Sequence, residues 1–404
     1  MSTSFLYHAF GMRGYSYIRQ NFWAGNIIFN AKPQPKIIKC SNCNSKKVIK
    51  RGEYERWLKT VPIGNKPVWI VVPVPRVECK KCGLVRRIDI QIADNRRWHT
   101  KAFERLALML CKSMTLKDVA EFLEVGWDTI KDIKKRYLSK KFSKPRLKSL
   151  KYIAIDEISV RKNHKYVTVV MDLVSGAVVY VGDGKEADAL KPFWKRLRHS
   201  GAKIEGVAID MSPAYISAVT ENLPNAPIIF DHFHIVKLMN EKLSKIRRTL
   251  HHELSKAGEK DVLKGSRWIL LKNPENLNPD KGEDQRLKEA LELNEPLATA
   301  YYMKEDLRQI WIQPDKNKAG KVLDDWISRA EASGVGQLKK MGKMLSTHRN
   351  RILAYYDHPI STGPLEGVNN KIKTMKRQAY GFRDMEFLKL RIMGIHESKY
   401  ALTG

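Results

Sequence analysis

The chain has 404 residues, enough for two or three domains that each bury a core. Its 74 lysines and arginines outnumber 43 aspartates and glutamates, and the net charge of +31 is spread along the whole sequence. A globular chain this basic implies a polyanionic partner, with DNA and RNA the leading candidates. The longest apolar run, Val68 to Pro75, contains prolines. It is far shorter than the roughly 18–20 residues of a membrane span, so we expect no membrane partner.

The N-terminus and the cysteines indicate where the protein works. His8, Gly11 and Arg13 interrupt the apolar core that a signal peptide would need. Four of the five cysteines occur in CxxC pairs, which favours a metal site in a reducing compartment over disulfides. We therefore expect a soluble intracellular protein.

Two CxxC knuckles near the N-terminus predict a zinc site. Soft thiolate ligands in this number suit tetrahedral zinc. The spacer between the knuckles is long, but Tyr54–Val61 and Val68–Val77 alternate like strands around a Gly64-Asn65 turn. A hairpin there would bring the knuckles together, and the zinc would be structural because all four ligands are protein groups. The alternative is four reduced, unpaired cysteines. The proposed ligands are Cys40, Cys43, Cys79 and Cys82.

A helical region follows the knuckles. Thr115 and Asp118 fit a capping box, and Gly126 suits the N-cap of the next helix, Trp127–Leu138. Two short helices joined by a turn with glycine are typical of a helix-turn-helix, whose second helix enters the major groove. The alternative is an ordinary helical hairpin with solvated lysines. The residues expected to contact DNA are Thr129, Lys131, Lys134 and Lys135.

Strands and helices then alternate, which predicts a mixed sheet with helices on its faces. The expected strands are Tyr152–Val160, Lys165–Asp172, Ala177–Val181, Gly206–Ile209 and Ile228–Phe230, and the helices are Asp188–His199 and Pro213–Asn222. Asp156 lies inside the first strand, where an unpaired charge is costly, and Asp210 ends the fourth. Glu157 competes with Asp156, since strand alternation alone does not choose between neighbours. Each carboxylate taken alone could also be a loop acid or an ion-pair partner.

Residues 235–355 read as helices throughout, so we expect them to form a helical insertion. The chain then enters a helix that starts near Pro364 and has Glu366 in its first turn. Asn370, Lys373 and Arg377 follow at helical spacing and share the side of Glu366. A carboxylate that holds a metal at the head of a row of phosphate-binding groups would have this pattern. The alternative is that Glu366 only satisfies free amides in the first turn.

These motifs together resemble bacterial insertion-sequence transposases of the Asp-Asp-Glu, RNase H-like kind, and above all the ISL3 family. The resemblance covers nearly the whole chain. Its motifs are Ala-Ile-Asp-Glu at 154–157, Ala-Ile-Asp-Met-Ser-Pro-Ala-Tyr at 208–215, Phe-Asp-His-Phe-His at 230–234 and Gly-Pro-Leu-Glu-Gly-Val-Asn-Asn-Lys-Ile-Lys at 363–373. It implies that Asp156, Asp210 and Glu366 are the catalytic triad, and it selects Asp156 over Glu157.

The resemblance also implies auxiliary residues and phosphate ligands. Asp231 with His234 matches a pair found in families with a helical insertion, and Trp268 matches an insertion motif. Read alone, these residues suit strand-end capping and core packing. The basic residues that the resemblance places on phosphates are Lys371, Lys373, Lys376 and Arg377.

The function implied is a DNA transposase that cleaves and transfers strands. Two Mg²⁺ or Mn²⁺ ions on the triad would activate the attacking oxygen and stabilise the leaving one, with Asp156 bridging both. No organic cofactor is expected. The zinc module and helix-turn-helix would read double-stranded transposon ends, and a homodimer or larger synaptic complex would join them to target DNA. The location expected is the cytoplasm, on the nucleoid. A sequence-specific DNA-binding regulator and an RNase H-like nuclease without transposition are the alternatives.

The expected fold class is a multidomain α/β protein. Its RNase H-like mixed sheet carries helices on both faces, is interrupted by an all-helical insertion, and is preceded by a zinc-binding β module and a helix-turn-helix. The expected domains are 1–98 for the zinc module, 99–145 for the helix-turn-helix, 146–234 and 356–404 for the catalytic core, and 235–355 for the insertion.

Overall fold

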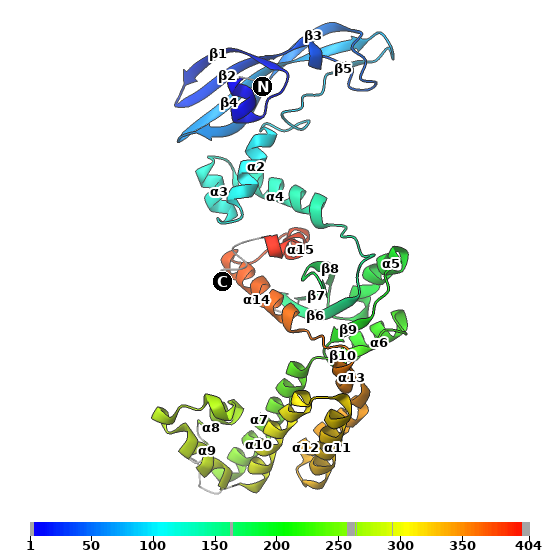
Figure 1. Cartoon of the computed structure of the whole chain (residues 1–404). Helices are drawn as coiled ribbons and strands as arrows, with labels where there is room; N and C mark the ends of the chain where they lie inside the picture. Colours follow the sequence, from blue (N-terminus) through cyan, green and yellow to red (C-terminus); the bar gives the residue numbers. More distant parts are fainter. Residues whose placement is uncertain (1–3, 162–164, 257–262, 264, 293, 398–404) are drawn as a thin grey trace. The chain divides into compact units, whose positions relative to one another are not determined.

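The computed structural model describes residues 4–161, 165–256, 263, 265–292 and 294–397 (Figure 1). The chain divides into two compact units. One contains Met1–Ser143 together with Arg377–Gly404, and the other contains Lys144–Lys376. Within the described residues, every helix is too short or too polar to cross a bilayer.

A five-stranded sheet forms most of the first unit. Its strands are β1 (Tyr15–Trp23), β2 (Asn26–Pro33), β3 (Val48–Ile63), β4 (Lys66–Cys79) and β5 (Val85–Arg87). The order is β1-β2-β4-β3, and β5 pairs with β4. The predicted hairpin is present, since Ile63 pairs with Lys66 around the turn and Gly64 adopts the left-handed φ of 58° that such a turn needs. Leu6 and Phe10 of α1 (Phe5–Phe10) belong to the core of this sheet.

Three helices follow in the same unit: α2 (Lys101–Leu110), α3 (Leu116–Phe122) and α4 (Trp127–Phe142). The capping box is formed, because Thr115 and Asp118 exchange hydrogen bonds of 3.2 Å. Gly126 is the N-cap of α4, as predicted. The helix runs to Phe142, further than the sequence pattern indicated. The last helix, α15 (Met385–Met393), belongs to this unit and packs on α4 through an apolar cluster of Leu138, Phe387 and Leu390.

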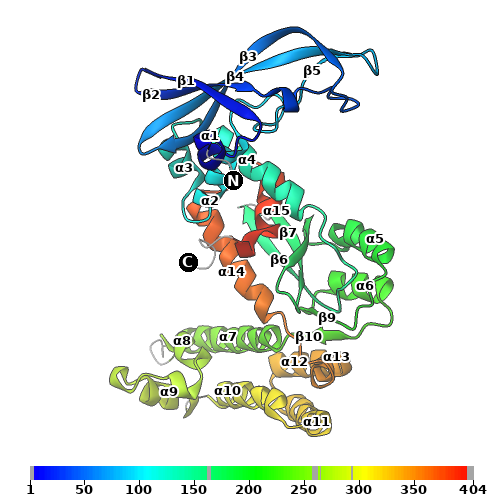
Figure 2. The ribbon, with the colours of Figure 1, turned by 45° about the horizontal axis from the view of Figure 1, so that its top comes forward.

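A second five-stranded sheet lies in the other unit. Its strands are β6 (Tyr152–Arg161), β7 (Lys165–Asp172), β8 (Val178–Asp183), β9 (Gly206–Ile209) and β10 (Ile228–Phe230). The order is β10-β9-β6-β7-β8, with β7 antiparallel to its neighbours and β9 and β10 parallel to β6. Helices α5 (Lys191–Ser200) and α6 (Pro213–Asn222) cover one face, and α14 (Gly363–Gln378) covers the other (Figures 1 and 2). This is the expected RNase H-like sheet.

Helices fill the chain between β10 and α14. They are α7 (His232–Lys256), α8 (Ser266–Leu271), α9 (Glu283–Glu292), α10 (Glu295–Arg308), α11 (Lys316–Ala332), α12 (Gly336–Thr347) and α13 (Arg349–Leu353). Trp326 is fully buried among them, and its indole N–H donates 2.8 Å to the carbonyl of Met303. A buried indole that finds a partner stabilises such a core. The predicted all-helical insertion is therefore present, and it starts at His232.

Candidate active site and metal centre

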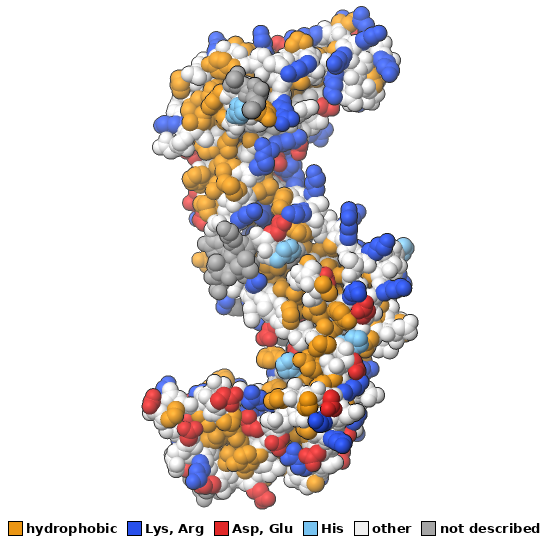
Figure 3. Space-filling view, in the orientation of Figure 1, with side chains coloured by type: hydrophobic (Ala, Val, Ile, Leu, Met, Phe, Trp, Pro, Cys, Tyr) orange, Lys and Arg blue, Asp and Glu red, His pale blue; other side chains and the backbone are white. Residues whose placement is uncertain are grey.

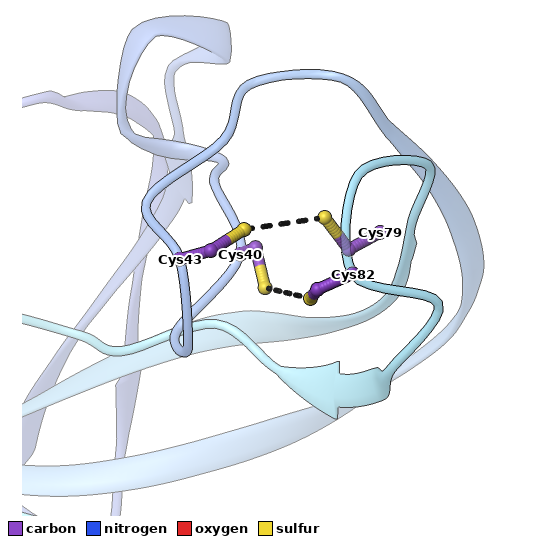
Figure 4. Close-up of side chains that lie close together, drawn as sticks. All are labelled: Cys40, Cys43, Cys79 and Cys82. Atoms are coloured by element: carbon purple, nitrogen blue, oxygen red, sulfur yellow. Dashed lines mark hydrogen bonds between the residues drawn. The ribbon is translucent and has the colours of Figure 1, made fainter.

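The four knuckle cysteines meet at one point in the first unit (Figure 4). Their sulfur atoms all lie within 4.8 Å of one another, with Cys40 and Cys82 3.7 Å apart and Cys43 and Cys79 3.5 Å apart. Thiolates bound to one zinc at about 2.3 Å would lie about 3.8 Å apart in a tetrahedron. The separations fit a structural zinc site.

Backbone amides prepare the first thiol of each knuckle, Cys40 and Cys79, for a metal. The N–H of Asn42 and that of Lys81 each point at the first sulfur of a knuckle, at 3.4 Å. The backbone amides of Cys82 and Lys81 lower the pKa of the Cys79 thiol to about 6. Because zinc binds thiolates, a lowered thiol pKa favours metal binding at neutral pH.

Two of the predicted catalytic carboxylates stand at equivalent places on neighbouring strands. Ile155 of β6 pairs with Ile209 of β9 in parallel, and Asp156 and Asp210 follow directly. Asp210 is at the carboxyl end of β9, where open α/β sheets place ligand sites, and Asp156 lies beside it in the middle of β6. Asp210 accepts a 2.9 Å hydrogen bond from the N–H of Ser212, which orients its side chain.

The structure separates Asp156 from its competitor Glu157. Asp156 accepts a 2.7 Å hydrogen bond from the Asn369 amide on α14, so it lies on the face that this helix covers. Glu157 instead bonds to the Tyr215 hydroxyl of α6, on the opposite face. Successive side chains of a strand point to opposite faces, and only Asp156 points toward the helix that carries Glu366.

Burial raises the pKa of Asp156, and the charge of Asp210 raises it further, while the N–H of Glu157 and His234 act in the opposite direction. Ionising a buried carboxyl group costs free energy, and a bound cation would offset that cost. Asn369 adds a second indication, because its Oδ1 is buried without a hydrogen-bond partner in the described part of the chain. Oxygen ligands of this kind fit a hard divalent cation.

Glu366 lies in the first turn of α14, and its side chain is exposed. Among the described residues its carboxylate has no hydrogen-bond partner, so the alternative of a capping glutamate is not observed. Among the described residues, the cysteines are the only group of three or more such ligands gathered closely enough to hold one metal ion, and the triad is not gathered in this way. The structure therefore brings two members of the triad together and places the third on the helix that packs against them.

The auxiliary residues divide into one buried and one exposed group. Asp231 is 3% exposed and accepts a 2.7 Å hydrogen bond from the hydroxyl of Thr362, which directly precedes α14. His234 lies 3.9 Å from the same carboxylate. Asp231 thus anchors the start of the Glu366 helix. Trp268 is 66% exposed, with the Arg267 guanidinium 4.8 Å from its ring centroid, so the core-packing alternative is wrong for Trp268.

The predicted phosphate ligands on α14 have different surroundings. Lys376 donates a 2.7 Å hydrogen bond to the carbonyl of Ser159, which ties the helix to β6. Lys373 is exposed and donates a 3.4 Å hydrogen bond to the Oδ1 of Asn370. Lys371 is half-buried, and Arg377 is exposed at the end of the helix. Lys373 and Arg377 are therefore the exposed residues of this set, and Lys371 is partly exposed.

The predicted DNA contacts of α4 are mostly engaged within the first unit. Lys131 and Lys135 lie 3.3 and 3.1 Å from Asp384, and Lys135 also pairs with Glu386 at 2.6 Å. Lys134 is 9% exposed, so it does not reach solvent as a recognition residue would. Thr129 is half-buried. Helix α15 therefore occupies the lysine-bearing side of α4, which the sequence did not indicate.

An open groove on the zinc module was not predicted from the sequence. It has a volume of about 730 Å³, and the Arg87 guanidinium lies 4.1 Å from the ring centroid of Tyr54 within it. Figure 3 shows lysines and arginines gathered over the end of the sheet that carries β3 and β5. The arginine doublets at 86–87 and 96–97 were the signal available in the sequence. Its basic and aromatic lining residues are Tyr54, Arg56, Trp57, Arg86, Arg87, Arg96, Arg97 and Trp98.

The fold and these sites define a DNA transposase with an Asp-Asp-Glu catalytic domain and a DNA-binding helix-turn-helix. Residues 153–392 match the ISL3 model for the transposase domain, residues 89–138 match the helix-turn-helix domain of transposase family ISL3, and residues 36–82 match the zinc finger of the IS204/IS1001/IS1096/IS1165 transposases. The chain belongs to the ISL3 family of transposases. It is therefore an enzyme that acts on DNA, and its zinc-finger domain and cysteine cluster support a structural zinc. The catalytic domain implies a divalent metal.

Individual relatives agree. The chain is 32% identical over 364 residues to the transposase for insertion sequence element IS1001 of Bordetella parapertussis, covering 89% of each chain. It is 28% identical over 389 residues to the IS1557 transposase of Mycobacterium tuberculosis, covering 90% of this chain and 86% of the relative. A Drosophila P element transposase strand transfer complex matches 74% of this chain and 92% of its own at 11% identity and a TM-score of 0.38. Likeness at that level carries no conclusion.

Proposed function

We propose that this transposase binds the terminal inverted repeats of its element and that Asp156, Asp210 and Glu366 catalyse strand cleavage and strand transfer. One observation carries the proposal. Asp156 and Asp210 follow paired residues on adjacent parallel strands, and Asp156 is hydrogen-bonded to the helix that has Glu366 in its first turn. Carboxylates that two neighbouring strands and a helix hold near one another suit phosphodiester chemistry on a metal.

Two Mg²⁺ or Mn²⁺ ions are the metals we assign to the triad. When bound, they would supply an activated water or 3′-hydroxyl and a stabilised leaving oxygen. The carboxylates of Asp156 and Asp210 and the exposed carboxylate of Glu366 would hold them, and these are the oxygen ligands that such ions prefer. Cys40, Cys43, Cys79 and Cys82 would hold the structural zinc.

Residues around the triad position it. Asn369 holds one oxygen of Asp156, and the backbone N–H of Glu157 holds the other at 2.8 Å. Thr362, bonded to Asp231, fixes where the Glu366 helix starts. Lys371 and Lys373, about one and two turns beyond Glu366 on α14, would bind the phosphates next to the scissile bond, because hydrogen bonds from charged donors to phosphate oxygens are strong.

We assign recognition of the double-stranded transposon end to the helix-turn-helix and to the open groove on the zinc module that arginines and aromatic rings line. Phosphate contacts fix the register on a duplex, and base contacts give the specificity. The arginines and aromatic rings of the groove suit the first role and the helix-turn-helix suits the second. Two ends must be joined to one target, so a homodimer or larger synaptic complex would assemble on DNA at the nucleoid in the cytoplasm.

A cleavage assay on a linear duplex with the element's own end tests the triad. Wild type should nick at the repeat boundary in Mg²⁺, and Asp156→Asn, Asp210→Asn and Glu366→Gln should each abolish nicking. Glu157→Gln is the matched control, because this neighbouring carboxylate bonds to Tyr215 on the opposite face. Nicking lost in Glu157→Gln and retained in Asp156→Asn would refute the assignment. Tight binding of the end without cleavage by wild type would favour a DNA-binding regulator.

A further inference from the structure

A basic groove runs between α7 and α8 in the helical insertion, apart from the residues assigned above. Its volume is about 410 Å³. Four of its lining residues are basic, namely Lys237, Arg247, Arg248 and Arg267, and one, Glu241, is acidic. The groove therefore carries an excess of positive charge.

The spacing along α7 explains why these side chains converge. Lys237, Glu241, Ser244 and Arg248 follow one another at three- and four-residue steps, so they lie on one side of the helix. Arg267 enters from the first turn of α8 and completes the opposite wall. The cluster is thus built on two helices and not on a mobile loop.

The arginines of this groove are not neutralised by ion pairs in the described part of the chain, although Glu241 is among the lining residues. Neither Arg247, Arg248 nor Arg267 forms an ion pair there. The Nε atom of Arg247 and the Oδ1 atom of Asn240 are buried without a hydrogen-bond partner among these residues. Burial, and then the charges of Arg267 and Arg248, lower the pKa of Arg247. Converging guanidinium groups with unused donors are costly unless an anion binds them.

Helix α7, which carries most of the groove's lining residues, starts beside the candidate active site. Helix α7 starts at His232, directly after Asp231, whose carboxylate bonds to Thr362 at the head of the Glu366 helix. His234 lies one turn before Lys237 on the same side of α7. At 1.5 Å per residue, the distance along the helix from His234 to Arg248 is about 21 Å.

We propose that the groove between α7 and α8 binds phosphate groups of the DNA strand that extends from the catalytic carboxylates. Guanidinium groups form bidentate bonds with phosphate oxygens, which would use the free donors of Arg247 and its neighbours. The helical insertion is then a DNA-binding element. The proposal rests on the proposed function, because it takes the DNA to leave the sheet edge at Asp156.

Salt dependence of binding tests the groove. The full chain is titrated, without divalent metal, into a fluorescent duplex that carries the element's end and its flanking DNA. Each phosphate contact contributes about 0.9 to the slope of log Kd against log salt concentration. We expect Arg247→Gln/Arg248→Gln to reduce the slope by about 1.8 and to weaken binding. The matched control Lys339→Gln/Lys340→Gln, exposed on α12, removes the same charge outside the groove and should leave the slope unchanged.

A second double variant controls for misfolding of the first. Lys237 and Arg248 are exposed, so Lys237→Gln/Arg248→Gln removes two groove charges without changing a buried side chain. It should reduce the slope by the same amount. A wild-type slope in both groove pairs, or an equal reduction in the α12 control, would overturn the proposal. A wrong assignment of the catalytic triad would give a different result from a wrong assignment of the groove. Asp156→Asn would then retain metal-dependent cleavage, while the salt slopes of binding would be unaffected.

Discussion

The hydrogen bond between Thr362 and Asp231 gives the sharpest prediction about how the Glu366 helix is held. The two side chains are 1% and 3% exposed, and their oxygens are 2.7 Å apart. Thr362→Val keeps the branched shape of the side chain and removes the donor. Asp231 would then keep a buried oxygen without its partner. A hydrogen bond to a charged group contributes about 1.5–3 kcal/mol, so the free energy of unfolding should fall by that amount.

Thermal unfolding followed by circular dichroism measures this loss. In a unit of roughly 150–250 residues, 1 kcal/mol shifts the Tm by about 2–4 °C, so we expect a decrease of roughly 3–12 °C. Thr362→Ser is the control, because serine keeps the hydroxyl and should cost much less. Cleavage should also slow in Thr362→Val below its Tm, since the helix carrying Glu366 loses an anchor. Equal stability of wild type and Thr362→Val, or an equal loss in Thr362→Ser, would refute the reasoning.

Three further predictions concern charge and metal. Burial raises the pKa of Asp156, so its ionised form destabilises the fold at neutral pH. Without added divalent metal, Asp156→Asn should therefore have a higher Tm than wild type at pH 7. The difference in Tm should shrink as the pH falls toward about 3.9, the ordinary pKa of an aspartate. A constant difference over that range would contradict the raised pKa. Asp384→Asn/Glu386→Gln should release Lys131 and Lys135 for DNA. Binding of the element's end should tighten and its salt slope should steepen by about 0.9 for each lysine freed; unchanged binding would mean that the ion pairs do not compete with DNA. Cys79→Ser should reduce the zinc content measured by atomic absorption and expose the zinc module to proteolysis, because three ligands remain; full zinc content would argue against the assigned ligands.

The sequence by itself determined those parts of the protein whose causes are local. Strands β7, β9 and β10 and helix α6 have the predicted boundaries, because side-chain periodicity and adjacent turn residues specify them over a few positions. The capping box at Thr115 follows from a three-residue spacing in the same way. Two CxxC pairs and a hairpin between them were enough to predict the cysteine cluster, since each knuckle is a short-range unit.

The candidate triad was named by a family resemblance and not by periodicity, and its catalytic role stays a prediction. Periodicity alone did not choose between Asp156 and Glu157. The choice depends on which face of the sheet α14 covers. The hydrogen bond from Asn369 to Asp156 shows this, and it joins residues that are far apart in the sequence. The same holds for the buried bond between Asp231 and Thr362.

Only the tertiary structure decided which charged groups are available. Lys131 and Lys135 have the spacing of a recognition helix, yet Asp384 and Glu386 engage both from the far end of the chain. The arginines of the α7–α8 groove look like solvated charges in the sequence, and they converge because two helices pack side by side. Local patterns fix which side of a helix a residue occupies. What that side faces depends on packing between segments distant in sequence, and no short window of sequence contains this information.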